Sequence, residues 1–270
     1  HTINADGNID TIAEVPNQPS GLGWLPDGSL VVVSMLDRKL MKINEGILSL
    51  HSDMSHLTPF QCNDMVIAKD GTAYVGNFGA DNAESNIKKT CLIAVSPEGE
   101  PKICASDLLF PNGAVITEDG KELIVGETFG GTLTSFKISK PGELINKSNW
   151  ANVMPKRYQI ITSIIRFLNI SLKESSNVPF PVPDGICLDA DYGIWVASPT
   201  TSEVIRYKKG GQITDRIATP NPAYACMLGG ENGKELYILT AESSVPQFCK
   251  ENKTGEIYKV PVSNKRAGQP

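Results

Sequence analysis

The feature of this sequence that most constrains its fold is a short frame that recurs along the chain. Each copy begins with a small or polar residue, continues through alternating apolar residues, and reaches an Asp-Gly, Asn-Gly or similar turn six or seven positions later. Apolar alternation on both sides of such a turn is typical of a β-hairpin. The copies run from Ser20 to Gly28, Asn63 to Gly71, Asn112 to Gly120, Asp184 to Gly193 and, more loosely, Cys226 to Gly233.

The spacing of these copies predicts a propeller. Their starts are 43, 49, 72 and 42 residues apart, which matches the length of a four-stranded propeller blade with one longer interval. A β-sandwich also uses short strands, but it does not need the same polar position at the head of every unit. We therefore expect an all-β fold, a β-propeller of four-stranded antiparallel blades, formed as one domain by residues 1–270.

The heads of the frames predict a polar ring. In a propeller the innermost strand of every blade lines the central channel, so equivalent residues converge on one axis. Carboxylate and amide oxygens are ligands that calcium prefers. A single Asn or Asp can instead satisfy backbone groups of a turn, but three aligned positions favour a metal site. The predicted ring, in which Asp184 is the only carboxylate, consists of Ser20, Asn63, Asn112, Asp184 and Cys226.

Composition limits the classes of binding partner and the cellular compartment that the sequence predicts. The net charge of −5 is dispersed and gives no electrostatic case for nucleic acid. No apolar run reaches the roughly 18 residues of a membrane span. The six cysteines have no C-x-x-C spacing, which predicts free thiols and a reducing, cytoplasmic location, with a disulfide in a secreted protein as the alternative. No G-x-S-x-G occurs and the histidines lie outside the frame, which disfavours a Ser-His-Asp hydrolase.

Four segments resemble the senescence marker protein, gluconolactonase and luciferin-regenerating family. They are CNDMVIAKDGTAYVGNFG, FPNGAVITEDGKELIVGET, PDGICLDADYGIWVA and ACMLGG, and the resemblance covers nearly the whole chain. It implies a six-bladed propeller with one divalent metal at the channel mouth, usually calcium, with zinc and manganese left open. It also implies hydrolysis of a small-molecule lactone.

The resemblance assigns roles by matching motifs. Asn112 and Asp184 correspond to metal ligands, Asp184 also corresponds to a general base, and Asn63 corresponds to a residue at both metal and substrate. The other ring positions, Ser20 and Cys226, are then predicted to contact the substrate beside Asn63. A propeller that binds a ligand or a protein without turnover is the alternative function, because a fold alone does not fix an activity.

The sequence departs from the family in its first blade. The family has a Glu ligand at the head of that blade, and the segment HTINADGNIDTIAEV corresponds only to the blade's outer part. We therefore expect an incomplete first blade, either in a fragment or in a protein with an incomplete ring. The fragment is favoured here, because an open propeller leaves strand edges unpaired.

A second departure is an insertion over residues 155–182. Ile161, Ile164, Ile165 and Leu168 recur there at helical spacing, which predicts a short amphipathic helix beside Asp184. This helix is either a lid with an apolar wall or an element that packs on a neighbouring blade or dimer partner. Nearby, Glu127 follows the LIVG segment and is expected to face solvent.

Overall fold

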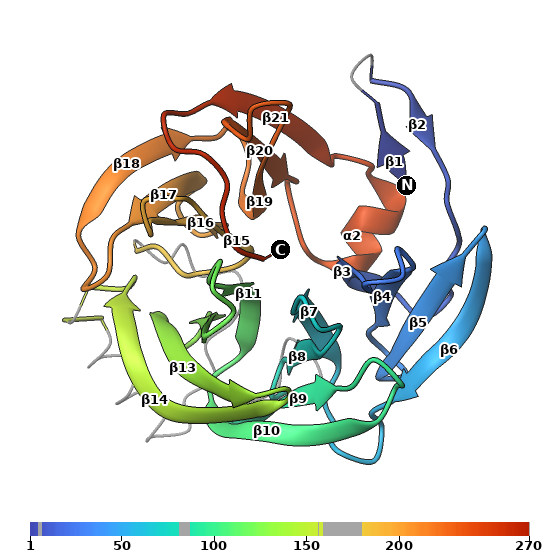
Figure 1. Ribbon diagram of the computed structural model, residues 1–270. Coiled ribbons are helices and arrows are strands. Elements are labelled where there is room, and N and C mark those ends of the chain that lie inside the picture. Colours follow the sequence, from blue (N-terminus) through green and yellow to red (C-terminus); the bar gives the residue numbers. More distant parts are fainter. Residues whose placement is uncertain (5–6, 81–86, 156, 159–179, 270) are drawn as a thin grey trace.

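Five consecutive antiparallel sheets surround a channel in the computed structural model, which describes residues 1–4, 7–80, 87–155, 157–158 and 180–269 (Figure 1). The β3–β6 blade contains β3 (Pro19–Trp24), β4 (Leu30–Ser34), β5 (Lys39–Asn44) and β6 (Ile47–Asp53). The β7–β10 blade contains β7 (Cys62–Ile67), β8 (Ala73–Asn77), β9 (Thr90–Val95) and β10 (Pro101–Leu108). The β11–β14 blade contains β11 (Pro111–Ile116), β12 (Glu122–Glu127), β13 (Thr132–Lys140) and β14 (Glu143–Asn152). The β15–β18 blade contains β15 (Ile186–Leu188), β16 (Ile194–Ser198), β17 (Glu203–Tyr207) and β18 (Ile213–Ala218), and the β19–β21 blade contains β19 (Ala223–Gly229), β20 (Glu235–Thr240) and β21 (Glu256–Pro261).

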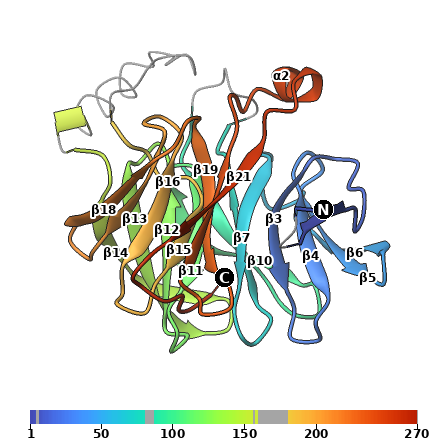
Figure 2. The ribbon, with the colours of Figure 1, turned by 90° about the horizontal axis from the view of Figure 1, so that it is seen from above.

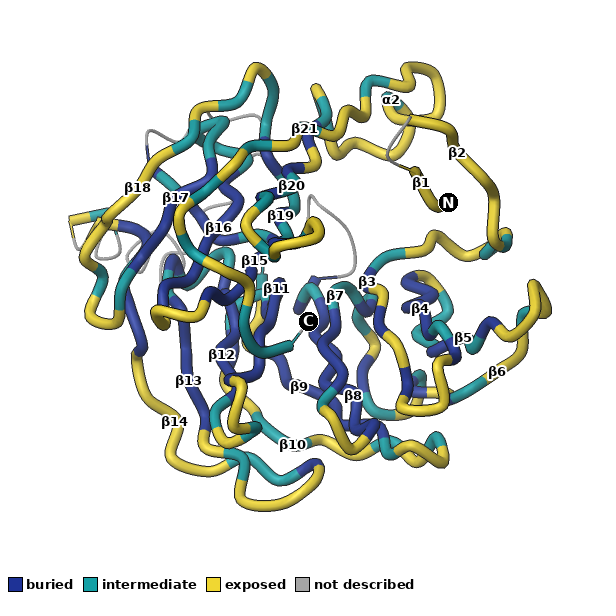
Figure 3. Tube along the Cα trace, turned by 45° about the horizontal axis from the view of Figure 1, so that its top comes forward, coloured by how far each residue is buried: buried dark blue, intermediate teal, exposed yellow. Residues whose placement is uncertain are grey.

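The predicted all-β propeller of four-stranded antiparallel blades is confirmed, but the described residues form five blades rather than six, and the last has three strands. A separate hairpin of β1 (Thr2–Ile3) and β2 (Ile9–Asp10) lies in the sector between the β19–β21 and β3–β6 blades (Figure 1). Both strands of this hairpin are exposed (Figure 3). The helix α2 (Pro246–Glu251) lies in the same sector, and no helix among the described residues is long and apolar enough to cross a membrane.

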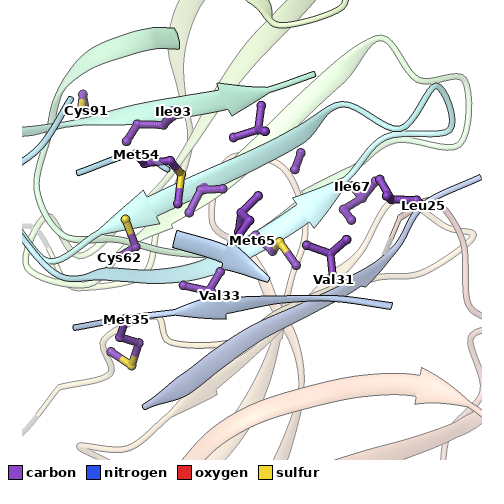
Figure 4. Packing of buried hydrophobic residues seen from close by; sticks show 14 residues of the cluster. Leu25, Val31, Val33, Met35, Met54, Cys62, Met65, Ile67, Cys91 and Ile93 are labelled. Carbon is purple, nitrogen blue, oxygen red and sulfur yellow. The ribbon is translucent and has the colours of Figure 1, made fainter. Parts of the chain in front are cut away.

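Apolar side chains fill the spaces between neighbouring blades. Val31 and Val33 of β4 lie together with Met65 and Ile67 of β7 in one of these cores (Figure 4). Successive residues of a strand face opposite sides of its sheet, so Val75 joins this core whereas its neighbour Tyr74 joins the core on the other face of the blade. The two further cores lie between the β11–β14 and β15–β18 blades and between the β15–β18 and β19–β21 blades.

A buried ion pair stabilises the β15–β18 blade. It lies at the end of the channel where β15 ends. Asp189 is 0% exposed, and its carboxylate accepts hydrogen bonds from Nε of Arg206 at 2.6 Å and from Nη2 at 3.0 Å. The same carboxylate accepts from Nε1 of Trp195 at 3.1 Å and from the backbone N–H groups of Asp191 and Gly193. The hydrogen bond with Asp189 raises the pKa of Arg206 above its ordinary value. One carboxylate therefore joins a turn, two strands and a tryptophan.

The C-terminal segment crosses the same end of the channel, near the centre of the ring in Figure 1. Gln269 exchanges backbone hydrogen bonds with Ile116 at the end of β11, at 2.7 and 2.8 Å. Ala267 donates to the carbonyl of Leu188 at the end of β15, and Arg266 donates to that of Gly233 after β19. The segment thereby connects three blades, while α2 lies at the opposite end of the molecule (Figure 2).

Most of the predicted insertion lies outside the described residues, which exclude residue 156 and residues 159–179. Its helix and its role as a lid therefore stay predictions. At the described ends of the insertion, the rings of Tyr158 and Phe180 lie 4.6 Å apart between centroids. Phe180 also packs with Met154 and Val182 in a small buried cluster.

Candidate functional site

The heads of three neighbouring innermost strands are joined by side-chain hydrogen bonds. The hydroxyl of Ser20 on β3 donates to Oδ1 of Asn63 on β7 at 3.0 Å. The Nδ2 of Asn63 donates in turn to Oδ1 of Asn112 on β11 at 2.9 Å. Hydrogen bonding by the Asn112 side chain acts to lower the pKa of Asp184, which precedes β15, so these two side chains lie close together. The structure thus brings together Ser20, Asn63, Asn112 and Asp184, and we call these four residues the polar ring.

A second carboxylate lies next to Asp184. Enclosure by protein atoms, and then the nearby charge of Asp64, raise the pKa of Asp184 to about 8. Enclosure likewise raises the pKa of Asp64 to about 6, although its Oδ1 accepts the Met65 N–H at 3.0 Å. Asp184 is therefore not the only carboxylate here. Two enclosed carboxyl groups that each disfavour the charge of the other are stabilised by a shared cation or by protonation.

Asp64 was not predicted as a site residue, because it occupies a position that is glycine in three other copies of the frame. Ser20, Asn112 and Asp184 are each followed by Gly, because neighbouring innermost strands approach closely at this position. A Cβ on Gly113 would lie 2.6 Å from the carbonyl oxygen of Asp184, and one on Gly21 would lie 2.8 Å from Oδ1 of Asp64. The signal for Asp64 in the sequence is that an aspartate, rather than glycine, follows Asn63.

Cys226 lies in the core rather than in the polar ring, which corrects its prediction as a ring residue. It is 3% exposed, and its Sγ lies 4.0 Å from Sγ of Cys187 in the core between the last two blades. In strand register, Ala223 pairs with the end of β20 as Cys62 pairs with the end of β8. The residue equivalent to Asn63 is therefore Tyr224, whose carbonyl accepts the N–H of Gly185 at 2.9 Å.

A loop residue and a buried glutamate support Asn112. The Nδ2 of Asn112 donates to Oγ1 of Thr128 at 3.1 Å, and Thr128 donates to the carbonyl of Pro183 at 2.8 Å. Glu127 is 6% exposed rather than facing solvent as expected, because its carboxylate accepts the N–H of Leu109 at 2.6 Å and the hydroxyl of Thr134. Glu127, which precedes Thr128, thus ties the segment that leads into β11 and Asn112 to β13.

The donor chemistry at the polar ring fits a hard divalent cation. Within the described residues no three His, Cys, Asp or Glu side chains gather as a metal site, so a cation needs amide oxygens as well as carboxylates. Asp64 and Asp184 supply two carboxylates, and Asn63 and Asn112 supply two amide groups. Such an oxygen set suits calcium better than a metal that prefers nitrogen or sulfur ligands.

Comparison with known proteins identifies the family. Residues 1–242 match the family model described as the SMP-30/Gluconolactonase/LRE-like region. The chain belongs to this family. Among its curated relatives, regucalcin of Xenopus laevis is 31% identical and human regucalcin is 30% identical, each over 83 residues. That stretch is 29% of this chain and 28% of each regucalcin, so less than a third of the curated relatives' length is matched.

Solved structures of the family share the fold. A calcium-binding protein, regucalcin, from Agrobacterium tumefaciens aligns with a TM-score of 0.70 at 18% identity, over 94% of this chain and 79% of the other. A gluconolactonase from Xanthomonas campestris aligns with a TM-score of 0.69 at 20% identity, over 97% of this chain and 77% of the other. At such identities the similarity supports the propeller fold and not a particular substrate.

Proposed function

We propose that this protein is a divalent-metal-dependent lactonase that uses calcium. The observation that carries the proposal is the hydrogen-bonded series Ser20, Asn63 and Asn112 with the carboxylates of Asp184 and Asp64 close to it. Membership of a family that contains gluconolactonases supports the same reaction. The six free cysteines support the proposal that it works in the cytoplasm.

Each residue has a role in this proposal. Asp184, Asn112 and Asn63 would hold the cation, with Asp64 adding negative charge. The bound cation would supply Lewis acidity toward the lactone carbonyl. Asp184, kept ionised by the bound cation, would accept a proton from the attacking water. Asn63 orients the substrate and Ser20 holds the Asn63 amide through its hydroxyl.

Metal removal tests the proposed function. We expect the protein to hydrolyse simple lactones in calcium, and we expect a chelator to lower kcat/KM by about a hundredfold or more, reversibly. Hydrolysis followed by a pH indicator, beside calorimetric calcium titration, measures both quantities. Calcium binding without turnover of any lactone would favour the alternative, a propeller that binds a ligand without catalysis.

Replacement of Asn63 separates orientation from metal binding. Asn63→Ala leaves the charges of Asp64 and Asp184 in place, so we expect the calcium Kd to change by less than about fivefold. The kcat/KM for a lactone should fall by about 10- to 100-fold, because the amide that positions Asn112 and the substrate is lost. Ser20→Ala, which removes only one hydrogen bond to Asn63, is the milder matched variant. A larger loss of calcium affinity than of kcat/KM would contradict this division of roles.

A further inference from the structure

Three phenylalanine rings form a continuous apolar surface in the loops around the polar ring. Phe78 and Phe110 stack with their centroids 4.5 Å apart and their planes at 16°. Phe129 packs against Phe110 at 5.2 Å, with the planes at 59°. All three side chains are only half-buried, so part of this surface is open to a ligand. We call Phe78, Phe110 and Phe129 the aromatic wall.

The backbone connects the aromatic wall to the polar ring. Phe110 lies two residues before Asn112, and its carbonyl accepts the N–H of Thr128 at 3.1 Å. Phe129 follows Thr128, whose hydroxyl accepts a hydrogen bond from Asn112. Phe78 donates its N–H to the carbonyl of Gln61, two residues before Asn63. Each ring of the wall therefore lies within two residues, along the chain or across one hydrogen bond, of a residue that belongs to the polar ring or is hydrogen-bonded to it.

Packing of the core accounts for only one of these rings. Phe78 packs against the core between the β3–β6 and β7–β10 blades. Within the described part of the chain, neither Phe110 nor Phe129 is a member of the core clusters. Half-buried aromatic rings that lie outside the core, at the catalytic end of an enzyme, are available to bind an apolar group.

The backbone at Phe110 makes an aromatic residue there unexpected. Its φ of +59° is in the left-handed region, which bulky residues disfavour. The equivalent turn of the β3–β6 blade has the same geometry, with Gln18 at a φ of +63° and its carbonyl accepting the N–H of Met35. Gln61 occupies the same position in the β7–β10 blade without a left-handed φ, so this conformation is particular to two of the blades, and Gly or Asn would adopt it more readily than Phe. Phe110 therefore adopts a backbone conformation that its own residue type disfavours.

The polar ring and the aromatic wall suit the two parts of one kind of substrate, a polar ester group and an apolar substituent. The polar ring offers groups for a polar ester, whereas the aromatic wall offers no hydrogen bond to hydroxyl groups. A hydroxyl pressed against the wall would lose its bonds to water without replacement. We propose that the substrate is a lactone that carries an aromatic or alkyl group, which lies on the aromatic wall, rather than a polyhydroxylated sugar lactone. This inference rests on the proposed lactonase function.

The test compares three lactones. Dihydrocoumarin carries a fused aromatic ring, δ-valerolactone carries no substituent, and δ-gluconolactone is polyhydroxylated. We expect the highest kcat/KM with dihydrocoumarin. Phe110→Ala should lower kcat/KM for dihydrocoumarin by about tenfold or more, and for δ-valerolactone by less than about threefold, because only the former contacts the wall. Phe129→Ala is the second variant, in a residue with ordinary φ, and thermal melting verifies that both variants fold.

Tyr192→Ala is the matched control. Tyr192 is also aromatic and also has a left-handed backbone, with a φ of +58°, but it lies in the turn between β15 and β16, at the opposite end of the channel. Its replacement should leave the ratio of the two kcat/KM values unchanged. If the wild-type enzyme prefers δ-gluconolactone, or if both wall variants keep the wild-type ratio, the aromatic subsite is wrong while the lactonase proposal stands.

Binding of lactams distinguishes failure of the subsite from failure of the proposed function. 3,4-Dihydro-2-quinolone and δ-valerolactam have the shapes of two of the lactones and resist hydrolysis. Calorimetric binding of the quinolone that weakens about tenfold in Phe110→Ala, with no lactone hydrolysed, would support the aromatic subsite and overturn the lactonase. Equal affinity of the quinolone for the wild-type protein and both wall variants would overturn the subsite whatever the turnover.

Discussion

Asp184→Asn is expected to lower lactone turnover by about a thousandfold and calcium affinity by about a hundredfold. The amide keeps the shape of the side chain but removes a proton acceptor, which alone contributes on the order of 10²–10⁴ in rate. It also removes one of the two carboxylate charges at the polar ring. Calorimetric calcium titration and steady-state hydrolysis of the same preparation measure the two effects.

The raised pKa of Asp184 provides a folding control for this variant. With its pKa raised to about 8, the carboxyl is mostly protonated at pH 7 when no cation is bound, and an amide closely matches that neutral form. The melting temperature in chelator should therefore equal that of the wild-type protein, whereas the stabilisation by calcium should be lost.

Substitutions of two further aspartates provide comparisons for the effects of Asp184→Asn. Asp64→Asn should reduce calcium affinity about tenfold, because Asp184 keeps its charge. Asp119→Asn, in an exposed turn at the opposite end of the channel, should change neither quantity. Wild-type calcium affinity and turnover in Asp184→Asn would return Asp184 to the role of a turn residue, and the proposed site would be wrong.

Asp189→Asn is expected to cost about 3–5 kcal/mol of the free energy of unfolding. The change leaves the guanidinium of Arg206, which is 4% exposed, without the carboxylate that accepts two of its N–H groups. It also weakens the acceptor of Trp195 Nε1 and of two backbone N–H groups. Urea unfolding followed by tryptophan fluorescence measures this loss.

A double-mutant cycle tests whether the loss comes from the stranded charge. Arg206→Met alone leaves Asp189 as a buried carboxylate, and the combination with Asp189→Asn removes both charges. The double variant should cost clearly less than the sum of the single variants. Additive costs would show that packing around the turn, rather than the ion pair, stabilises the blade. Asp119→Asn, as an exposed turn aspartate, should cost no more than about 1 kcal/mol.

The propeller could be predicted from the sequence because its repeat is local. The polar head and the Asp-Gly turn of each blade lie within one hairpin, and the alternation of Val and Ile around them fixes the faces of the sheet. The number of blades was harder to predict from the sequence. The hairpin of β1 and β2 reads as two short strands in the sequence, but whether it completes a blade depends on neighbours far along the chain.

The polar ring was predictable in part, for reasons visible at single residues. Asn63, Asn112 and Asp184 stand in unbroken frames, and the structure brings them together. Measured from Tyr224, the last copy of the frame is one residue longer between head and turn than the others, and this difference displaced the alignment from Tyr224 to Cys226. Glu127 could not be placed from its own strand, since its partners are the backbone of Leu109 and the hydroxyl of Thr134 on other segments.

The C-terminal crossing has a consequence for the order of folding. Gln269 pairs with Ile116, and Ala267 with Leu188, so residues near position 270 complete contacts with blades that are synthesised much earlier. Contacts of such wide sequence separation carry a large loop-closure entropy and form slowly. The blades can therefore assemble as hairpins during synthesis, while the connection of the three blades across the channel forms only after residues 266–269 have been made. Refolding of this protein should accordingly show a slow final phase, and removal of residues 265–270 should abolish that phase without preventing the earlier ones.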